Sequence, residues 1–154
     1  MVYDHIKGGQ GHVVFLHGFK SDRKGSKAAF LKGWCADHDI GFTAIDMMAH
    51  GESEGDMMDF SLTEALNDVL YALDNLIDGP AVLVGSSMGG WLALRAAEER
   101  PEKVKGIVGI AAAPDFTAEI AARMTDEQLA QMATQGYITE ESGYEEPYVF
   151  TRTL

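Results

Sequence analysis

The chain has 154 residues, of which 46% are hydrophobic and 23% charged, enough for one globular domain with a core. Its 24 acidic and 12 basic residues give a formal charge of -12, which argues against nucleic acid as a partner, because a phosphate backbone is bound by clustered lysine and arginine. The single cysteine excludes an internal disulfide and cannot alone form a zinc site. The glycine-rich residues 8–11 precede a predicted strand rather than follow one, so they are no dinucleotide fingerprint, and neither a metal nor an organic cofactor is expected.

The N-terminal segment lacks the features of a secretory signal. Residues 1–10 include Asp4 and Lys7 where such a signal needs an uninterrupted apolar stretch. No segment approaches the roughly 18 apolar residues that cross a membrane. Together with the lone cysteine, these features predict a soluble, cytoplasmic protein without a membrane span.

The first half of the chain alternates predicted strands and helices. Residues 13–16 and 42–45 are short β-branched and aromatic runs, typical of buried strands. Between them, residues 26–38 have apolar side chains at helical spacing. Ser61 is the expected N-cap of the next helix, with Glu64 three residues later as its capping-box partner.

The same alternation continues in the middle of the chain. Residues 81–84 form a third predicted strand, followed at once by a helix that runs to about Arg100. Residues 104–112 form a fourth apolar run, which we expect to be a strand buried on both faces. The order βαβαβαβ predicts an α/β protein with a mostly parallel sheet and helices on both faces.

After Pro114 the pattern changes. Residues 116–123 and 125–134 are predicted to be two short amphipathic helices, the second opened by the capping-box pair Thr125 and Gln128.

The last residues have no strand pattern, and residues 148–154 resemble the first turns of a helix. We therefore divide the chain into residues 1–115, the N-terminal part of the core, and residues 116–154, a cap segment.

The strongest chemical signal is the motif G-x-S-x-G, present as Gly85-Ser86-Ser87-Met88-Gly89 between an apolar strand and a helix, which is the context this motif requires. Gly85 and Gly89 leave room for a tight turn that exposes a serine hydroxyl, and the helix N-terminus favours developing negative charge. Ser87 is the predicted nucleophile. The alternative is an ordinary glycine-rich turn with a buried serine.

A second signal, His17-Gly18-Phe19, follows the first of these strands, where hydrolases place the other half of an oxyanion hole. The backbone N–H groups of Phe19 and Met88 are predicted to hold a tetrahedral oxyanion. We expect the ring of His17 to orient this loop, because a hydrolase base follows the nucleophile in the chain.

No triad acid or base can be assigned in this chain. Its five histidines all precede Ser87: His5, His12, His17, His38 and His50. His50 is the one candidate for a recruited base, because its loop follows a strand on the rim that carries Ser87. Asp115 is a candidate acid, although a helix N-cap is the favoured interpretation. Asp46 is expected to order a loop.

Four segments have a family resemblance: FLHGFKSD at residues 15–22, GES at 51–53, GSSMGGWL at 85–92 and GIAAAPDF at 109–116. They resemble the α/β-hydrolases of the branch that includes the mitochondrial palmitoyl-protein thioesterase and acyl-glucuronide esterase, together with its bacterial relatives. The resemblance implies the α/β-hydrolase fold, Ser87 as nucleophile, N–H donors from Phe19 and Met88, and a small cap from residue 116 to about 148.

That family usually begins with a further strand before Tyr3 and continues beyond Leu154 through two strands that carry the catalytic Asp and His. We therefore expect this chain to be a fragment with the C-terminal strands missing, with a natural short form as the alternative. The expected function is hydrolysis of carboxylic esters or acyl thioesters, on a small acyl ester or an acylated protein. The rival hypothesis is a non-catalytic acyl-ligand binding protein of the same fold.

Overall fold

The computed structural model describes residues 1–142 and 147–154. Five strands form one sheet in the order β1-β3-β2-β4-β5. β1 pairs antiparallel with β3, whereas the other pairs are parallel. The strands are β1 (Val2–Ile6), β2 (His12–Leu16), β3 (Gly41–Asp46), β4 (Ala81–Ser86) and β5 (Val104–Ile110). The predicted mostly parallel α/β sheet is confirmed.

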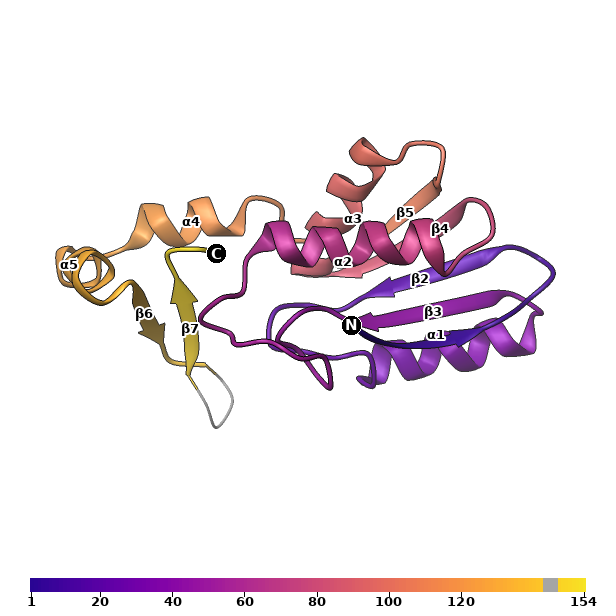
Figure 1. Cartoon of the computed structure of the whole chain (residues 1–154), viewed down its shortest axis with the longest axis horizontal. Helices are drawn as coiled ribbons and strands as arrows, with labels where there is room; N and C mark the ends of the chain where they lie inside the picture. Colours follow the sequence, from indigo (N-terminus) through magenta and orange to yellow (C-terminus); the bar gives the residue numbers. More distant parts are fainter. Residues whose placement is uncertain (143–146) are drawn as a thin grey trace.

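Helices cover both faces of this sheet, as predicted. α1 (Ser26–Asp37) lies on one face, and α2 (Leu62–Asn75) and α3 (Met88–Glu99) lie on the other (Figure 1). The N-cap of α2 is also confirmed, because the hydroxyl of Ser61 accepts a hydrogen bond of 3.2 Å from the N–H of Glu64.

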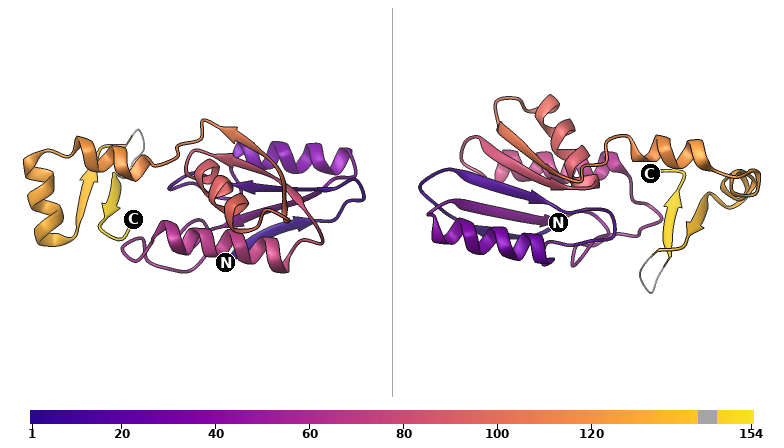
Figure 2. Two further views of the ribbon diagram at one scale, coloured as in Figure 1. Left: turned by 90° about the horizontal axis from the view of Figure 1, so that it is seen from above. Right: turned by 180° about the vertical axis from the view of Figure 1, so that it is seen from behind.

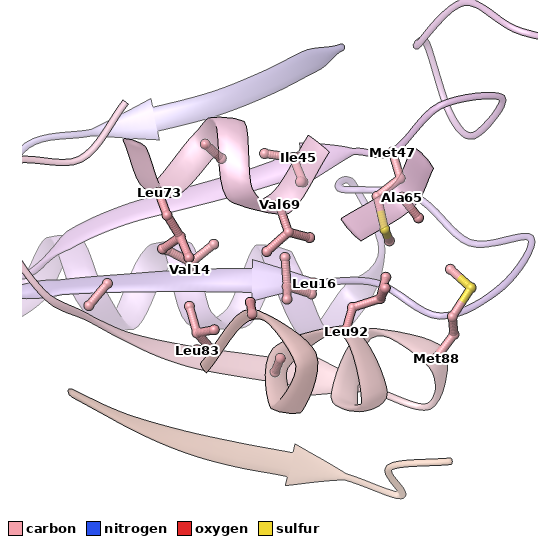
Figure 3. Close-up of a cluster of buried hydrophobic side chains, with 14 of the residues drawn as sticks. Val14, Leu16, Ile45, Met47, Ala65, Val69, Leu73, Leu83, Met88 and Leu92 are labelled. Atoms are coloured by element: carbon pink, nitrogen blue, oxygen red, sulfur yellow. The ribbon is translucent and has the colours of Figure 1, made fainter. Parts of the chain in front are cut away.

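The core divides into two layers because side chains alternate across β2. Val14 and Leu16 point toward α2 and α3, into the larger cluster shown in Figure 3. Phe15 points the other way, into a smaller cluster that includes the fully buried Cys35 of α1. This period-2 alternation is what a strand requires when both of its faces are covered.

Both edge strands differ from the sequence expectation. β1 was not predicted from residues 1–10, because Asp4 and His5 interrupt its apolar pattern; both side chains are instead bonded to neighbouring elements. β5 is not buried on both faces: it forms an edge of the described sheet, and Val108 is 49% exposed.

The remaining described residues, 116–142 and 147–154, form what we call the C-terminal lobe. It comprises α4 (Phe116–Arg123), α5 (Asp126–Gln135) and an antiparallel hairpin of β6 (Tyr137–Glu140) and β7 (Tyr148–Thr151). The lobe projects beyond the end of the sheet at which the arrowheads of β2 and β3 lie (Figure 2).

The two predicted helices of the lobe are confirmed, and so is the capping box of Thr125 and Gln128. The expectation that no strand follows them is wrong, as is the helical interpretation of residues 148–154. The hairpin forms because Ile138 and Phe150, which are opposite each other in register, pack on Ile120 of α4. Strands of four residues are too short for a distinct alternating pattern.

No helix within residues 1–142 and 147–154 is both long and apolar enough to traverse a bilayer.

Candidate active site

Ser87 occupies a sharp turn between β4 and α3. Its backbone has φ 51° and ψ -118°, a conformation that costs free energy in a residue with a side chain. The turn is held by the end of β5, since the N–H of Ser87 donates to the carbonyl of Ile110 at 3.0 Å. The carbonyl of Ser87 accepts from the N–H of Gly90 at 2.9 Å. Ser87 is exposed, so its hydroxyl is accessible to a ligand.

Glycines in and directly after the motif are required by close approach of neighbouring atoms. A Cβ atom on Gly85 would lie 2.3 Å from the carbonyl oxygen of Gly89, and one on Gly90 would lie 2.5 Å from the Cβ of Ala112. Side chains at these positions would force α3 away from β4 and β5.

The loop after β2 lies against this turn. A Cβ atom on Gly18 would be 3.3 Å from the Cβ of Ser87, and the N–H of Ser21 donates to the carbonyl of Gly18 at 3.1 Å, closing a tight turn around Phe19. This arrangement brings together the residues that the sequence proposes for the nucleophile and for one oxyanion donor.

His17 is buried beneath the loop. Its Nδ1 donates to the carbonyl of Gly18 at 2.8 Å, and its Nε2 accepts from the N–H of Met47 at 3.3 Å, so these partners require the tautomer protonated at Nδ1. Burial lowers the pKa of His17 to about 4, which keeps the ring neutral at pH 7. The ring therefore links the loop after β2 to the end of β3.

A buried ion-pair cluster holds the loops that follow β2 and β3. Asp46 accepts from the N–H of Arg23 at 2.7 Å and from the N–H of Glu52 at 2.9 Å, and it also pairs with the Arg23 guanidinium. The same guanidinium bonds to Asp4 at 3.2 Å and pairs with Glu52. The loop-ordering role expected of Asp46 is confirmed, whereas Arg23 was missed because an isolated arginine in a loop carries no pattern.

His50 forms no hydrogen bond with Ser87 in the part of the chain that the structure describes. Its Nδ1 donates to the carbonyl of Met48 at 2.9 Å, and its buried Nε2 has no hydrogen-bond partner. The ring packs at centroid distances of 4.9 Å from Phe60 and 5.8 Å from Phe19, and burial lowers its pKa. Among residues 1–142 and 147–154, no imidazole is hydrogen-bonded to Ser87.

Asp115 precedes α4 at the N-cap position, with φ 58°. Its side chain makes no capping hydrogen bond, so the N-cap contact expected from the sequence is not formed. The left-handed backbone explains the difference, because a capping residue normally has an extended conformation that directs its oxygen to the first turn.

A cleft of about 590 Å³ lies between the core and the C-terminal lobe. The core side includes Ser87, Met88, Gly18 and Phe19, which are four of the residues singled out from the sequence. From the lobe, the rings of Phe116, Tyr148 and Phe150 line the same cleft, and charged side chains, among them Lys27, Arg123 and Glu140, also border it. The family resemblance implies a cap over the site from residue 116 to about 148, but it does not single out these side chains.

Comparison with known proteins identifies the family of the chain that forms this cleft. A family model described as alpha/beta hydrolase fold matches residues 11–141. The chain belongs to the α/β-hydrolase family. The fold and the family resemblance predicted from the sequence are thereby confirmed.

Among curated proteins, this α/β-hydrolase chain is 33% identical over 150 residues to the human protein named "Palmitoyl-protein thioesterase ABHD10, mitochondrial", with 97% of this chain and 49% of the relative covered. It is 39% identical over 115 residues to the rat protein of the same name, with 75% of this chain and 39% of the relative covered. The chain thus spans less than half the length of these relatives.

Two solved structures are similar over almost the whole chain. A putative hydrolase from Agrobacterium vitis S4 superimposes with a TM-score of 0.94 at 34% identity, covering 99% of this chain and 62% of that one. Alpha/beta hydrolase domain-containing protein 10 from mouse gives a TM-score of 0.86 at 32% identity, covering 97% and 60% respectively.

These relatives contradict the cytoplasmic location expected from the sequence, because the human and rat proteins are named as mitochondrial. The expectation rested on the lack of an apolar stretch in residues 1–10. That feature argues only against a secretory signal, since mitochondrial transit peptides are amphipathic rather than apolar.

Proposed function

We propose that this α/β-hydrolase is a serine esterase or thioesterase that uses Ser87 as its nucleophile. The observation that carries the proposal is the exposed hydroxyl of Ser87, presented on a strained turn in a cleft that also contains Phe19 and Met88. The oxygen of Ser87 attacks the acyl carbonyl, and the N–H groups of Phe19 and Met88 stabilise the resulting oxyanion. Collapse of this intermediate expels the alcohol or thiol, and water then hydrolyses the acyl-enzyme.

The reaction needs a general base that accepts the proton of Ser87 and passes it to the leaving group. The five histidines precede Ser87, and His50 is buried under Phe19. We therefore assign the base, and the acid that orients it, to residues outside these 154. The relatives, which are about twice as long, support this assignment.

The proposed substrate is an acyl thioester or carboxylic ester, on a small molecule or on a protein. The aromatic rings of Phe116, Tyr148 and Phe150 provide an apolar wall for the acyl group. The names of the human and rat relatives suggest a palmitoyl group as one such acyl chain.

Fluorophosphonate labelling followed by intact-mass measurement tests the nucleophile on a longer protein that contains this chain and the proposed base. The expected result is one adduct that disappears in Ser87→Ala and persists in Ser86→Ala, the neighbouring serine of the same cleft. An adduct that survives Ser87→Ala would assign the nucleophile elsewhere.

The second candidate function is binding of an acyl ligand without turnover. It is favoured by the absence, within the described residues, of an imidazole bonded to Ser87. If the folded longer protein forms no adduct but binds a fatty acid with equal affinity before and after Ser87→Ala, this function replaces the first.

A further inference from the structure

The side chain of Phe19 packs both on the C-terminal lobe and on the core. Its ring stacks on that of Phe150 at a centroid distance of 5.7 Å and an interplanar angle of 18°. The rings of Tyr148 and Phe116 follow at 6.0 and 6.5 Å. From the core, Phe60 and His50 each contribute a ring at 5.8 Å. Three of these five rings belong to α4 and β7, although Phe19 itself is in the loop after β2.

The next residue is tied to the lobe as well. Nζ of Lys20 donates to the carbonyl of Pro147 at 3.0 Å, immediately before β7. By contrast, the preceding residues are fixed by the core, because His17 bonds to Gly18 and to Met47. The loop therefore has two anchors: residues 17–18 are attached to the sheet, whereas residues 19–20 also contact the lobe, through three rings and one hydrogen bond.

We infer that Phe150 is a positioning residue for the oxyanion hole, which it serves by fixing the ring of Phe19 and hence the direction of its backbone N–H. This inference rests on the proposed function, in which that N–H donates to the tetrahedral oxyanion. A displaced donor slows reaction at Ser87 for every acyl group, because the oxyanion is common to all of them. Substitution of a residue that only lines the cleft slows the reaction just for acyl groups long enough to touch that residue.

Two fluorophosphonates, one with an ethyl and one with a dodecyl substituent, distinguish these roles, because the phosphoryl oxygen of each takes the place of the oxyanion. The variant is Phe150→Leu, made in the longer protein that carries the proposed base. The matched control is Ile138→Val, because Ile138 is opposite Phe150 in the hairpin and fully buried, yet does not line the cleft.

Phe150→Leu is expected to slow modification of Ser87 by both probes about tenfold or more, a part of the 10²–10³-fold effect of removing one oxyanion donor. Ile138→Val is expected to leave both rates unchanged. If Phe150→Leu slows only the dodecyl probe, or neither, the inference is wrong. The unfolding midpoint of each variant shows that the comparison is made on folded protein.

Amide hydrogen exchange separates failure of this inference from failure of the proposed function. If the unsubstituted longer protein is not labelled at Ser87, the proposed function fails, and exchange at Ser21, whose N–H closes the loop onto Gly18, still reports the anchoring. Faster exchange in Phe150→Leu than in Ile138→Val supports it, and equal exchange in the two variants overturns it.

Discussion

A Cβ atom on Gly89 would lie 2.1 Å from the carbonyl oxygen of Leu16. The first turn of α3 thus rests directly on the backbone at the end of β2, closer than any residue with a side chain permits. This contact places the turn that carries Ser87 beside the loop that carries Phe19, because β2 leads into that loop.

Gly89→Ala is therefore expected to destabilise the protein, although alanine is normally the better helix former by about 1 kcal/mol. The clash is with backbone, which cannot rotate away, and we expect a loss of about 1–3 kcal/mol in the free energy of unfolding. Gly33→Ala in α1 is the control, because its Cβ would meet nothing within 4 Å, and it should stabilise the protein. Urea unfolding of both variants measures this; destabilisation of equal size in both would contradict it.

Relief of backbone strain is expected in Ser87→Gly. At φ 51° and ψ -118°, a residue with a Cβ costs about 1–3 kcal/mol, and glycine does not. Allowing for the greater freedom of glycine in the unfolded chain, Ser87→Gly should be about 1 kcal/mol more stable than Ser87→Ala. Thermal unfolding compares the two, and the same pair of substitutions at Ser86, in β4, should show the reverse order.

Arg23→Met should be severely destabilising. It leaves the carboxylate of Asp46, which is fully buried, without its ion-pair partner, a change that typically costs about 3–5 kcal/mol. Arg100→Met removes an arginine from an exposed pair with Asp74 and should cost less than about 1 kcal/mol. Denaturant unfolding curves for the two variants would contradict this if their midpoints shifted equally.

The buried His17 makes stability depend on pH. Burial lowers its pKa to about 4, whereas an exposed imidazole titrates near 6.5, so the unfolded chain binds more protons between these values. The free energy of unfolding contributed by this ring is fully present above pH 6.5 and falls as the pH decreases toward 4, by up to about 3 kcal/mol. NMR titration of the His17 ring in the folded protein checks this directly, and a midpoint near 6.5 would refute it.

The sequence predicted the central sheet because its strands are buried and apolar. Residues 13–16, 42–45 and 81–84 all became parallel strands, and the helices between them needed only spacing and caps to be recognised. The turn that carries Ser87 could also be predicted, because the motif G-x-S-x-G lies between a strand and a helix. The close approach of Gly85 to Gly89 explains why the motif needs these glycines.

The contacts made by the C-terminal lobe could not be predicted from the local sequence pattern. Residues 148–154 pack through single aromatic rings on a loop more than a hundred positions earlier, and no periodicity records such a contact. The structural role of Arg23 could not be predicted either, because its partners come from β1, from β3 and from the loop that follows β3. Pairwise contacts between distant segments need the fold before they can be recognised.

Cys35 is the only thiol of the chain, and it is completely enclosed between α1 and the sheet. An alkylating reagent can reach its sulfur only when α1 detaches or the whole domain opens, and burial further raises the pKa of the thiol. The rate at which Cys35 is alkylated therefore reports how often α1 opens, and mass spectrometry measures this rate without a dye or an introduced label.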